Sequence, residues 1–291
     1  MVSLPCAYRP SPRVRSGLES GVISQKVGLL FGEGRAPCYI AARPTGRYLP
    51  RRIIYLLRMQ MPISLFDSAP PPRDVTHQVL QMVVSNLTEL SMLAVPPSNH
   101  LYEIYKWAVP AEVNLYIDRI GQVPIAPVEL LVAFDEETPG HVLGFLMYLP
   151  VPTHSDACGV TYMAVQKTHR GRGIGSAMMK KAIERYPHVE LTCPVAKVGF
   201  YERLGFQVLD THNTQVVMNT RSASTEGQMA IVDVEPIYRS SQALEIRDRL
   251  LARWGRKEMV NAETQLNRHV AQLQRQAVAF VGGRLGSGVK A

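Results

Sequence analysis

One stretch of the 291-residue chain, from Arg170 to Ser176, constrains the fold more than any other. It reads Arg-Gly-Arg-Gly-Ile-Gly-Ser and joins a β-rich run, 160–165, to a run with helical spacing, 175–186. Glycines lack the Cβ atoms that keep backbone N–H groups away from a ligand, and the first turn of a helix adds unpaired N–H donors and a partial positive charge. The stretch therefore predicts a phosphate-binding site between a strand and a helix.

Three kinds of phosphate-binding loop share this composition, and spacing separates them. A Walker-type loop needs Gly-Lys-Ser/Thr after its glycines, whereas the first lysine to follow them here is Lys180. A dinucleotide-binding loop needs a preceding βαβ unit, whereas two β-rich runs in hairpin arrangement, 128–134 and 142–149, precede this loop. The third pattern, R-x-x-G-x-G, is matched from Arg170 onward.

Residues 62–220 alternate between strand and helix periods. We expect, in chain order, a strand, two helices, three strands, a helix, a strand, a short helix and two strands, at 62–66, 74–90, 102–120, 128–134, 142–149, 160–165, 175–186, 189–193, 195–204, 206–209 and 215–218. Asp74 is the expected cap of the first helix, and Pro110 is expected to restart the second.

A second segment, Val-Gly-Phe-Tyr-Glu-Arg-Leu-Gly-Phe at 198–206, resembles the "fYeklGF" segment of the GNAT superfamily of acyl-CoA N-acyltransferases. With the R-x-x-G-x-G loop and the order of elements, it makes residues 59–220 similar to a GNAT domain. The resemblance implies an α/β (α+β mixed) fold with a central mixed, mostly antiparallel sheet flanked by helices. It also implies an N-acetyltransferase in which a primary amine attacks acetyl-CoA, the co-substrate, directly through a tetrahedral intermediate.

The resemblance also places roles on matching positions. In this family the strand before the loop separates from its neighbour at a bulge, and its backbone, here Met163 to Val165, binds the pantetheine arm. The N–H of Val165 is expected to stabilise the oxyanion, and Tyr201 to protonate the leaving thiolate. The expected pyrophosphate-binding residues are Arg170, Gly171, Arg172, Gly173, Ile174, Gly175 and Ser176.

The general base is the role that no residue matches. Many relatives use a glutamate on the strand before the loop, but residues 161–164 contain no carboxylate. Cys193 is expected to be a small buried hydrophobe and not a nucleophile, because no histidine is near it in sequence. The missing carboxylate leaves a second hypothesis open, a catalytically inactive CoA-binding regulatory module. Four residues remain candidates for the base by proximity in the sheet: Glu129, Asp135, His141 and Glu190.

Charge sets the N-terminal segment apart. All of the formal net charge of +8 arises within residues 1–60, and the rest of the chain is neutral, so a nucleic-acid partner is not expected of the folded part. We expect residues 1–58 to be a basic segment with little fixed structure, with translation from Met59 or Met61 as one explanation. A transit segment and a nucleic-acid-binding arm are the alternatives.

Cysteine spacing and hydropathy bear on the compartment. The four cysteines are far apart and include no CxxC pair, which predicts neither a metal site nor a disulfide framework. No apolar run is long enough to cross a bilayer, and the first thirty residues lack the apolar stretch of a secretory signal. These features predict a cytoplasmic protein without a membrane partner.

The C-terminal segment, 221–291, lies outside the family resemblance. It is expected to form a strand at 229–234 and then two helices with apolar faces. We expect these helices to pack on their own domain or on each other, with a homodimer or partner contact as the alternative. The residues of the two faces are Ala243, Ile246, Leu250 and Trp254, and Leu266, Val270, Leu273 and Ala277.

Overall fold

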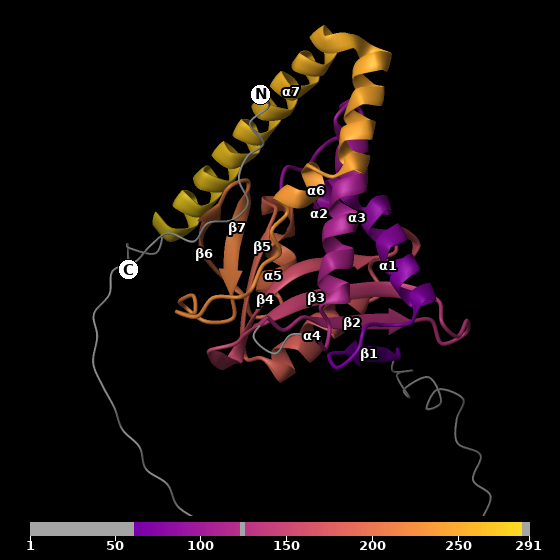
Figure 1. Cartoon of the computed structure of the whole chain (residues 1–291). Helices are drawn as coiled ribbons and strands as arrows, with labels where there is room; N and C mark the ends of the chain where they lie inside the picture. The colour runs from indigo at the N-terminus through magenta and orange to yellow at the C-terminus, as the bar shows by residue number, and fades with distance from the viewer. Residues whose placement is uncertain (1–60, 123–125, 287–291) are drawn as a thin grey trace, which may run out of the picture. The chain divides into compact units, whose positions relative to one another are not determined.

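The structure is a computed structural model that describes residues 61–122 and 126–286, so the predictions for residues 1–58 lie outside it. Its centre is a seven-stranded sheet in the order β1-β2-β3-β4-β5-β7-β6 (Figure 1). Neighbouring strands are antiparallel except β4 and β5, which confirms the mixed, mostly antiparallel sheet. The strands are β1 (Ile63–Phe66), β2 (Glu129–Phe134), β3 (Val142–Val151), β4 (His154–Val165), β5 (His188–Cys193), β6 (Gln207–His212) and β7 (Gln215–Asn219).

Helices cover both faces of this sheet. Alternating side chains of β2 supply the two cores, because successive residues of a strand point to opposite faces: Leu130 and Val132 lie in one core, and Leu131 and Ala133 in the other. The first core is shared with α1 and α3, and the second with α4 and α5. The helices are α1 (Arg73–Ser85), α2 (Leu87–Leu90), α3 (Tyr102–Asp118), α4 (Ile174–Arg185), α5 (Val198–Glu202), α6 (Glu235–Tyr238) and α7 (Ser241–Gly286).

The first predicted helix is divided in two. It begins at Arg73 after an N-cap Pro72, and no side chain caps it, so the prediction that Asp74 is the cap was wrong. Asp74 instead occupies the first turn, where its charge favours the helix dipole. Asn86 ends α1, and its side-chain amide donates to the Met82 carbonyl at 2.7 Å, so the helix does not continue into α2.

Two further elements differ from their predictions. Pro110 lies inside α3, which runs without interruption because side chains on both sides of the proline, Val109 and Val113 among them, are buried in one core. β4 begins earlier than predicted, at His154, since its first half is held between β3 and β5.

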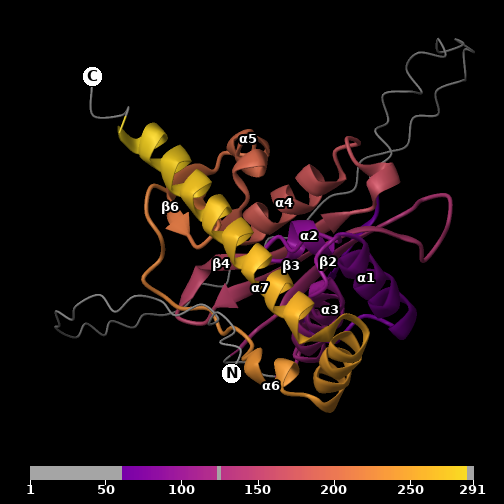
Figure 2. The ribbon, with the colours of Figure 1, turned by 90° about the horizontal axis from the view of Figure 1, so that it is seen from above.

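The C-terminal segment packs beside the domain. Residues 229–234 form no strand, and α7 bends at Gly255, whose φ of +75° suits glycine. The return arm of α7, residues 256–286, extends from beside α3 to beside β6 (Figure 2). Asn99 donates to the Ala262 carbonyl at 2.8 Å near one end of this arm, and Arg284 pairs with Glu202 at 3.1 Å near the other. The arm therefore packs against its own domain, and a homodimer contact stays a prediction.

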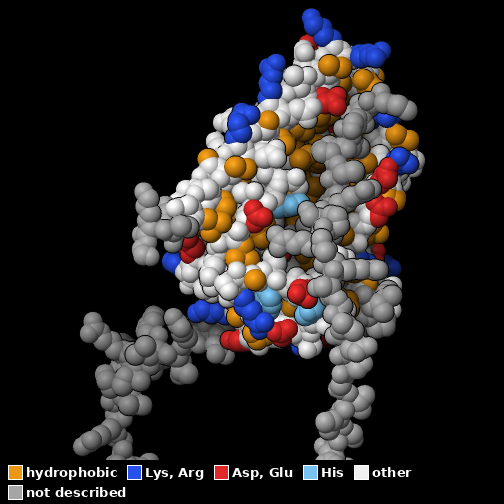
Figure 3. Space-filling model, turned by 90° about the vertical axis from the view of Figure 1, so that its left-hand side faces the viewer, with side chains coloured by type: hydrophobic (Ala, Val, Ile, Leu, Met, Phe, Trp, Pro, Cys, Tyr) orange, Lys and Arg blue, Asp and Glu red, His pale blue; other side chains and the backbone are white. Residues whose placement is uncertain are grey.

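The bend of α7 carries a local excess of basic residues. In Figure 3, Lys and Arg side chains lie toward the top of the molecule, the end at which α7 bends in Figure 1. The exposed basic residues around the bend are Arg247, Arg249, Arg253, Arg256 and Lys257.

None of the helices in the described ranges is long and apolar enough to span a membrane.

Candidate active site

The parallel strands β4 and β5 are paired over only part of their length. The ladder joins 157–160 to 188–191. Beyond it, β4 pairs only with β3, and the last residues of β5 pair only with β7. The register between β3 and β4 also shifts at Met147, which leaves Thr161 as an extra residue, a β-bulge. The strands thus separate at a bulge, and residues 161–165 have no strand partner on the β5 side within the described ranges.

The register shows which backbone groups face that open edge. Gln166 donates its N–H to the Leu143 carbonyl on β3, at 2.8 Å. Hydrogen-bonding direction alternates along an antiparallel strand, so the backbone N–H groups of Val165 and Met163 point away from β3 and toward the side where β5 has separated. These are two of the backbone positions that the family resemblance predicts for binding the pantetheine arm.

The glycine-rich loop leads into the uncapped start of α4. Gly171 and Gly173 have φ values of +77° and +83°, a region that disfavours side chains with a Cβ. The first helical hydrogen bond runs from the Ala177 N–H to the Gly173 carbonyl, at 2.9 Å, and no side chain caps the helix. The N–H groups of residues 174–176 therefore remain as donors at the positive end of α4.

Side chains from β4 and α5 converge on Gly175 in this first turn. A Cβ at Gly175 would lie 3.6 Å from Phe200, 3.7 Å from Val165 and 3.9 Å from Met163, which is ordinary van der Waals contact. The predicted strand, loop and helix positions are thus brought together around one point. Tyr201 adjoins it, with its ring 4.9 Å from that of Phe200.

Tyr201 is buried among apolar side chains. It is 8% exposed and contacts the rings of Phe200 and Phe206 edge-on. Burial raises the pKa of its phenol well above the ordinary value, so the hydroxyl holds its proton at neutral pH. Burial also raises the pKa of nearby Cys193 to about 12, which keeps that thiol protonated and unreactive, as expected of a small buried hydrophobe.

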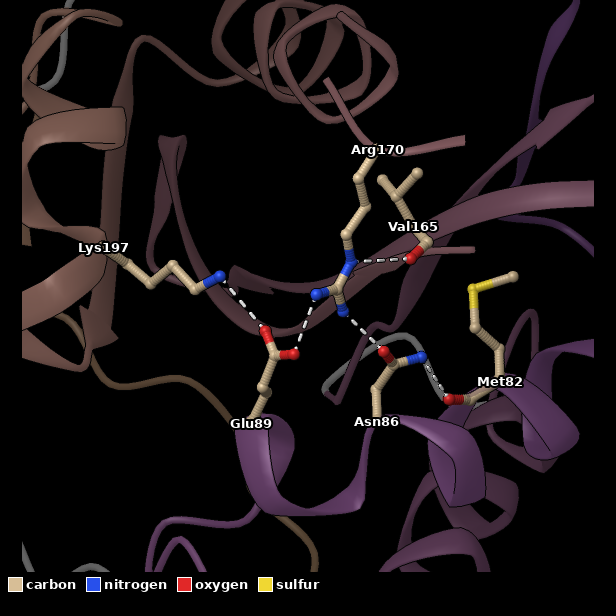
Figure 4. A network of polar contacts seen from close by, with 6 residues as sticks. All are labelled: Met82, Asn86, Glu89, Val165, Arg170 and Lys197. Carbon is tan, nitrogen blue, oxygen red and sulfur yellow. Dashed lines mark hydrogen bonds and ion pairs between the residues drawn. The ribbon is translucent and has the colours of Figure 1, made fainter. Parts of the chain in front are cut away.

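Arg170 joins the loop to the first two helices (Figure 4). Its guanidinium donates to the Val165 carbonyl at 3.3 Å, to Asn86 Oδ1 at 2.6 Å and to Glu89 Oε1 at 2.8 Å. The other oxygen of Glu89 pairs with Lys197 at 3.1 Å, in the short turn after β5. Glu89 thus bridges basic residues that follow the two separating strands. Phosphate binding by Arg170 stays a prediction, and the structure adds this tie to α1 and α2.

Residues 127–208 match the family model of the acetyltransferase (GNAT) domain. The chain contains a GNAT superfamily domain. The matched range includes β4, the glycine-rich loop, α4 and α5, and it ends before α7. The match supports an acyltransferase enzyme that uses an acyl-CoA. It does not identify the acyl group or the acceptor.

Solved structures resemble the chain at low identity. An acyl-CoA N-acyltransferase from Pseudomonas aeruginosa is 15% identical over 56% of this chain and 100% of its own, with a TM-score of 0.39. A GNAT-family acetyltransferase from Staphylococcus aureus is 11% identical over 55% of this chain and 100% of its own, with a TM-score of 0.36. No curated protein matches significantly. These likenesses say nothing about the acceptor.

The predicted candidates for the general base have other partners in the GNAT domain. Glu129 lies near the far end of α4, where Arg185 contacts both of its carboxylate oxygens, at 2.7 and 3.0 Å. The hydroxyl of Tyr186 donates to it at 2.6 Å. These three hydrogen bonds hold the carboxylate at the end of α4 opposite the glycine-rich loop. The other three candidates bond to nearby groups of the sheet and its turns: Asp135, His141 and Glu190.

A carboxylate that the sequence did not single out, Glu112 on α3, lies beside the open part of β4. The hydroxyl of Tyr162 lies near enough to this carboxylate to favour its ionised form. Burial raises the pKa of Glu112 to about 7, against an opposing effect of that hydroxyl. Helical spacing in the sequence could have indicated this residue. Glu112 stands four residues after Ala108 and four before Tyr116, on the buried stripe of its helix. A charged residue on such a stripe is a candidate for function.

Proposed function

We propose that this GNAT domain transfers an acetyl group from acetyl-CoA to a primary amine by direct attack. The separation of β4 and β5 beside the uncapped start of α4 carries the proposal. An extended pantetheine arm fits the open edge of residues 161–165 as an added strand would, while the pyrophosphate meets the N–H groups of α4. The choice of an acetyl group over a longer acyl chain follows from the family match alone.

The residues around that edge supply two steps of the chemistry. The amine nitrogen attacks the thioester carbonyl, and the N–H of Val165, which faces the open edge, donates to the resulting oxyanion. Collapse of the intermediate breaks the C–S bond, and the thiolate takes the proton of Tyr201. The pKa of this phenol lies above that of a thiol, so the transfer is favourable only because the attacking nitrogen loses its second proton and returns a proton to Tyr201.

Coenzyme A binding is tested on the glycine of the loop. Gly173→Val forces a β-branched residue to a φ of +83° at the start of α4, and we expect CoA affinity, measured by calorimetry, to fall about tenfold or more. Gly140→Val is the matched control, because Gly140 has a φ of +82° and open surroundings in the β2–β3 hairpin. Equal CoA affinity in both variants, or no CoA binding by folded wild type, would contradict the proposal.

Turnover is tested on the phenol. Tyr201→Phe should lower kcat for thiol release from acetyl-CoA by about 10- to 100-fold and leave CoA affinity unchanged, because only proton donation to the leaving thiolate is lost. Wild type that binds CoA but releases no thiol with any of a panel of primary amines would instead be the CoA-binding module without turnover.

A further inference from the structure

The acceptor must reach the thioester from a definite side of the sheet. The side chains of Met163 and Val165 lie in the core shared with α4, whereas Tyr162 packs against the core shared with α3. Helices cover both faces, but the phosphate site lies at the start of α4, so the amine is expected on the opposite face, where Tyr162 is only partly buried. An amine on that face would lie next to the hydroxyl of Tyr162, which interacts with Glu112.

The surroundings of Glu112 are aromatic. Tyr116 and Tyr162 meet edge to face with ring centroids 6.5 Å apart, and Tyr105 and Tyr238 meet in the same way at 6.0 Å. Two of these tyrosines are fully buried, Tyr105 and Tyr116. Part of the surface stays accessible on Tyr162, Tyr238 and Glu112. Tyrosine rings and a carboxylate together attract an ammonium group on an apolar stem.

The charged groups nearby leave Glu112 without a cation. Arg119, the residue that follows α3, lies over the ring of Tyr116, 5.8 Å from its centroid, and donates to two backbone carbonyls. Glu263, on α7, interacts electrostatically with Tyr105, and because it is itself an acid it does not neutralise Glu112. No basic residue in the described part of the chain pairs with Glu112, so the substrate's own ammonium is the complementary charge.

We propose that Glu112, beside Tyr162 and one helical turn before Tyr116, binds the acceptor's ammonium group and takes its proton, so that the acceptor is a primary alkylamine with an apolar stem. This assignment rests on the proposed acetyl transfer. It supplies the base that is absent from residues 161–164, from a helix more than forty residues earlier in the chain. A single carboxylate among tyrosines favours a monocation over a polyamine.

The protons balance as follows in this scheme. The ammonium loses one proton to the carboxylate of Glu112, and the free amine forms the new C–N bond. The nitrogen loses its second proton as the C–S bond breaks and the thiolate takes the proton of Tyr201, which is replenished by the one from nitrogen. The products are the amide, CoA thiol and one proton, which Glu112 returns to solvent.

The test uses n-butylamine as the acceptor probe and thiol release from acetyl-CoA across a pH series. Wild-type kcat should rise through an inflection near the pKa of Glu112, about 7. Glu112→Gln should lack that inflection, and near neutral pH its kcat should be about 100-fold lower, because the amine must then lose its proton to water. Its rate should climb with pH toward the pKa of the amine itself.

Matched variants make the outcomes distinct. Glu103→Gln, on the exposed side of the same helix, should match wild type. Tyr162→Phe removes the hydroxyl that lowers the pKa of Glu112, so it should move the inflection to higher pH and lower kcat less than Glu112→Gln does. If the Glu112→Gln profile keeps the inflection and the rate, or if spermidine proves a better acceptor than n-butylamine, Glu112 does not have this role. Absence of CoA binding by wild type would instead overturn the acetyl transfer itself.

Discussion

Two Glu–Tyr pairs lie on opposite faces of the sheet and differ in what else they contact. Glu129 and Tyr186, on the α4 face, share their site with Arg185, which also pairs with Asp67 at 3.0 Å. Glu112, on the α3 face, has the Tyr162 hydroxyl but no basic partner in the described ranges. A carboxylate with its charge neutralised in place holds elements together. One without such neutralisation can exchange a proton more readily, and this contrast is why we propose a catalytic role for Glu112 and a structural role for Glu129.

The largest expected difference is in stability. Glu129→Gln removes the charge that pairs with Arg185 and should lower the free energy of unfolding by about 3 kcal/mol, the low end for a buried pair because Arg185 is partly exposed. Glu112→Gln should leave it unchanged or raise it, since a half-buried carboxylate without a cation is removed. Urea denaturation of both variants at one pH measures the difference. Equal losses in the two variants would erase the distinction between the pairs.

The pH dependence of unfolding should separate the pairs by a smaller amount. The folded-state pKa of Glu112 is raised from 4.5 to about 7, so between these values the folded state binds more protons than the unfolded state. Stability from this group is full below about pH 4.5 and declines as pH rises through 7, by about 1 to 2 kcal/mol for a half-buried carboxyl. The difference in unfolding free energy between Glu112→Gln and wild type should therefore grow over that window. Parallel curves for the two proteins would argue against a raised pKa.

The smallest effect is expected at a third carboxylate, Glu89, which has two cations but is exposed. Partial burial opposes ionisation, yet hydrogen bonds from Arg170 and Lys197 lower the pKa of this carboxyl below its ordinary value. Glu89→Gln should cost less than about 0.5 kcal/mol of stability. It should tighten CoA binding about threefold at low salt, with the gain lost at high salt, because the two cations become available to phosphate. Calorimetry at two salt concentrations decides, and weaker CoA binding would show that Glu89 positions the loop instead.

Short-range patterns accounted for the elements that build the phosphate site. The period-two runs of β2 and β3, the helical spacing of α4 and the glycines between strand and helix are local properties, so these elements could be predicted, whereas the convergence on Gly175 appears only in the fold. Local patterns were less reliable where tertiary packing decides. Asn86 ends the first helix through its own side-chain hydrogen bond, and α3 continues through Pro110 because its flanks are buried together.

The sequence by itself determined the class of domain and the backbone donors of the proposed coenzyme site, because a glycine-rich turn ahead of a helix creates these donors within a few residues. Only the tertiary structure decided which partners each acid has. Glu129 and Glu112 look alike in the sequence, and their difference arises because folding brings Arg185 to one and only tyrosines to the other. A carboxyl group's charge depends on partners distant in the chain, and only the packed fold selects those partners.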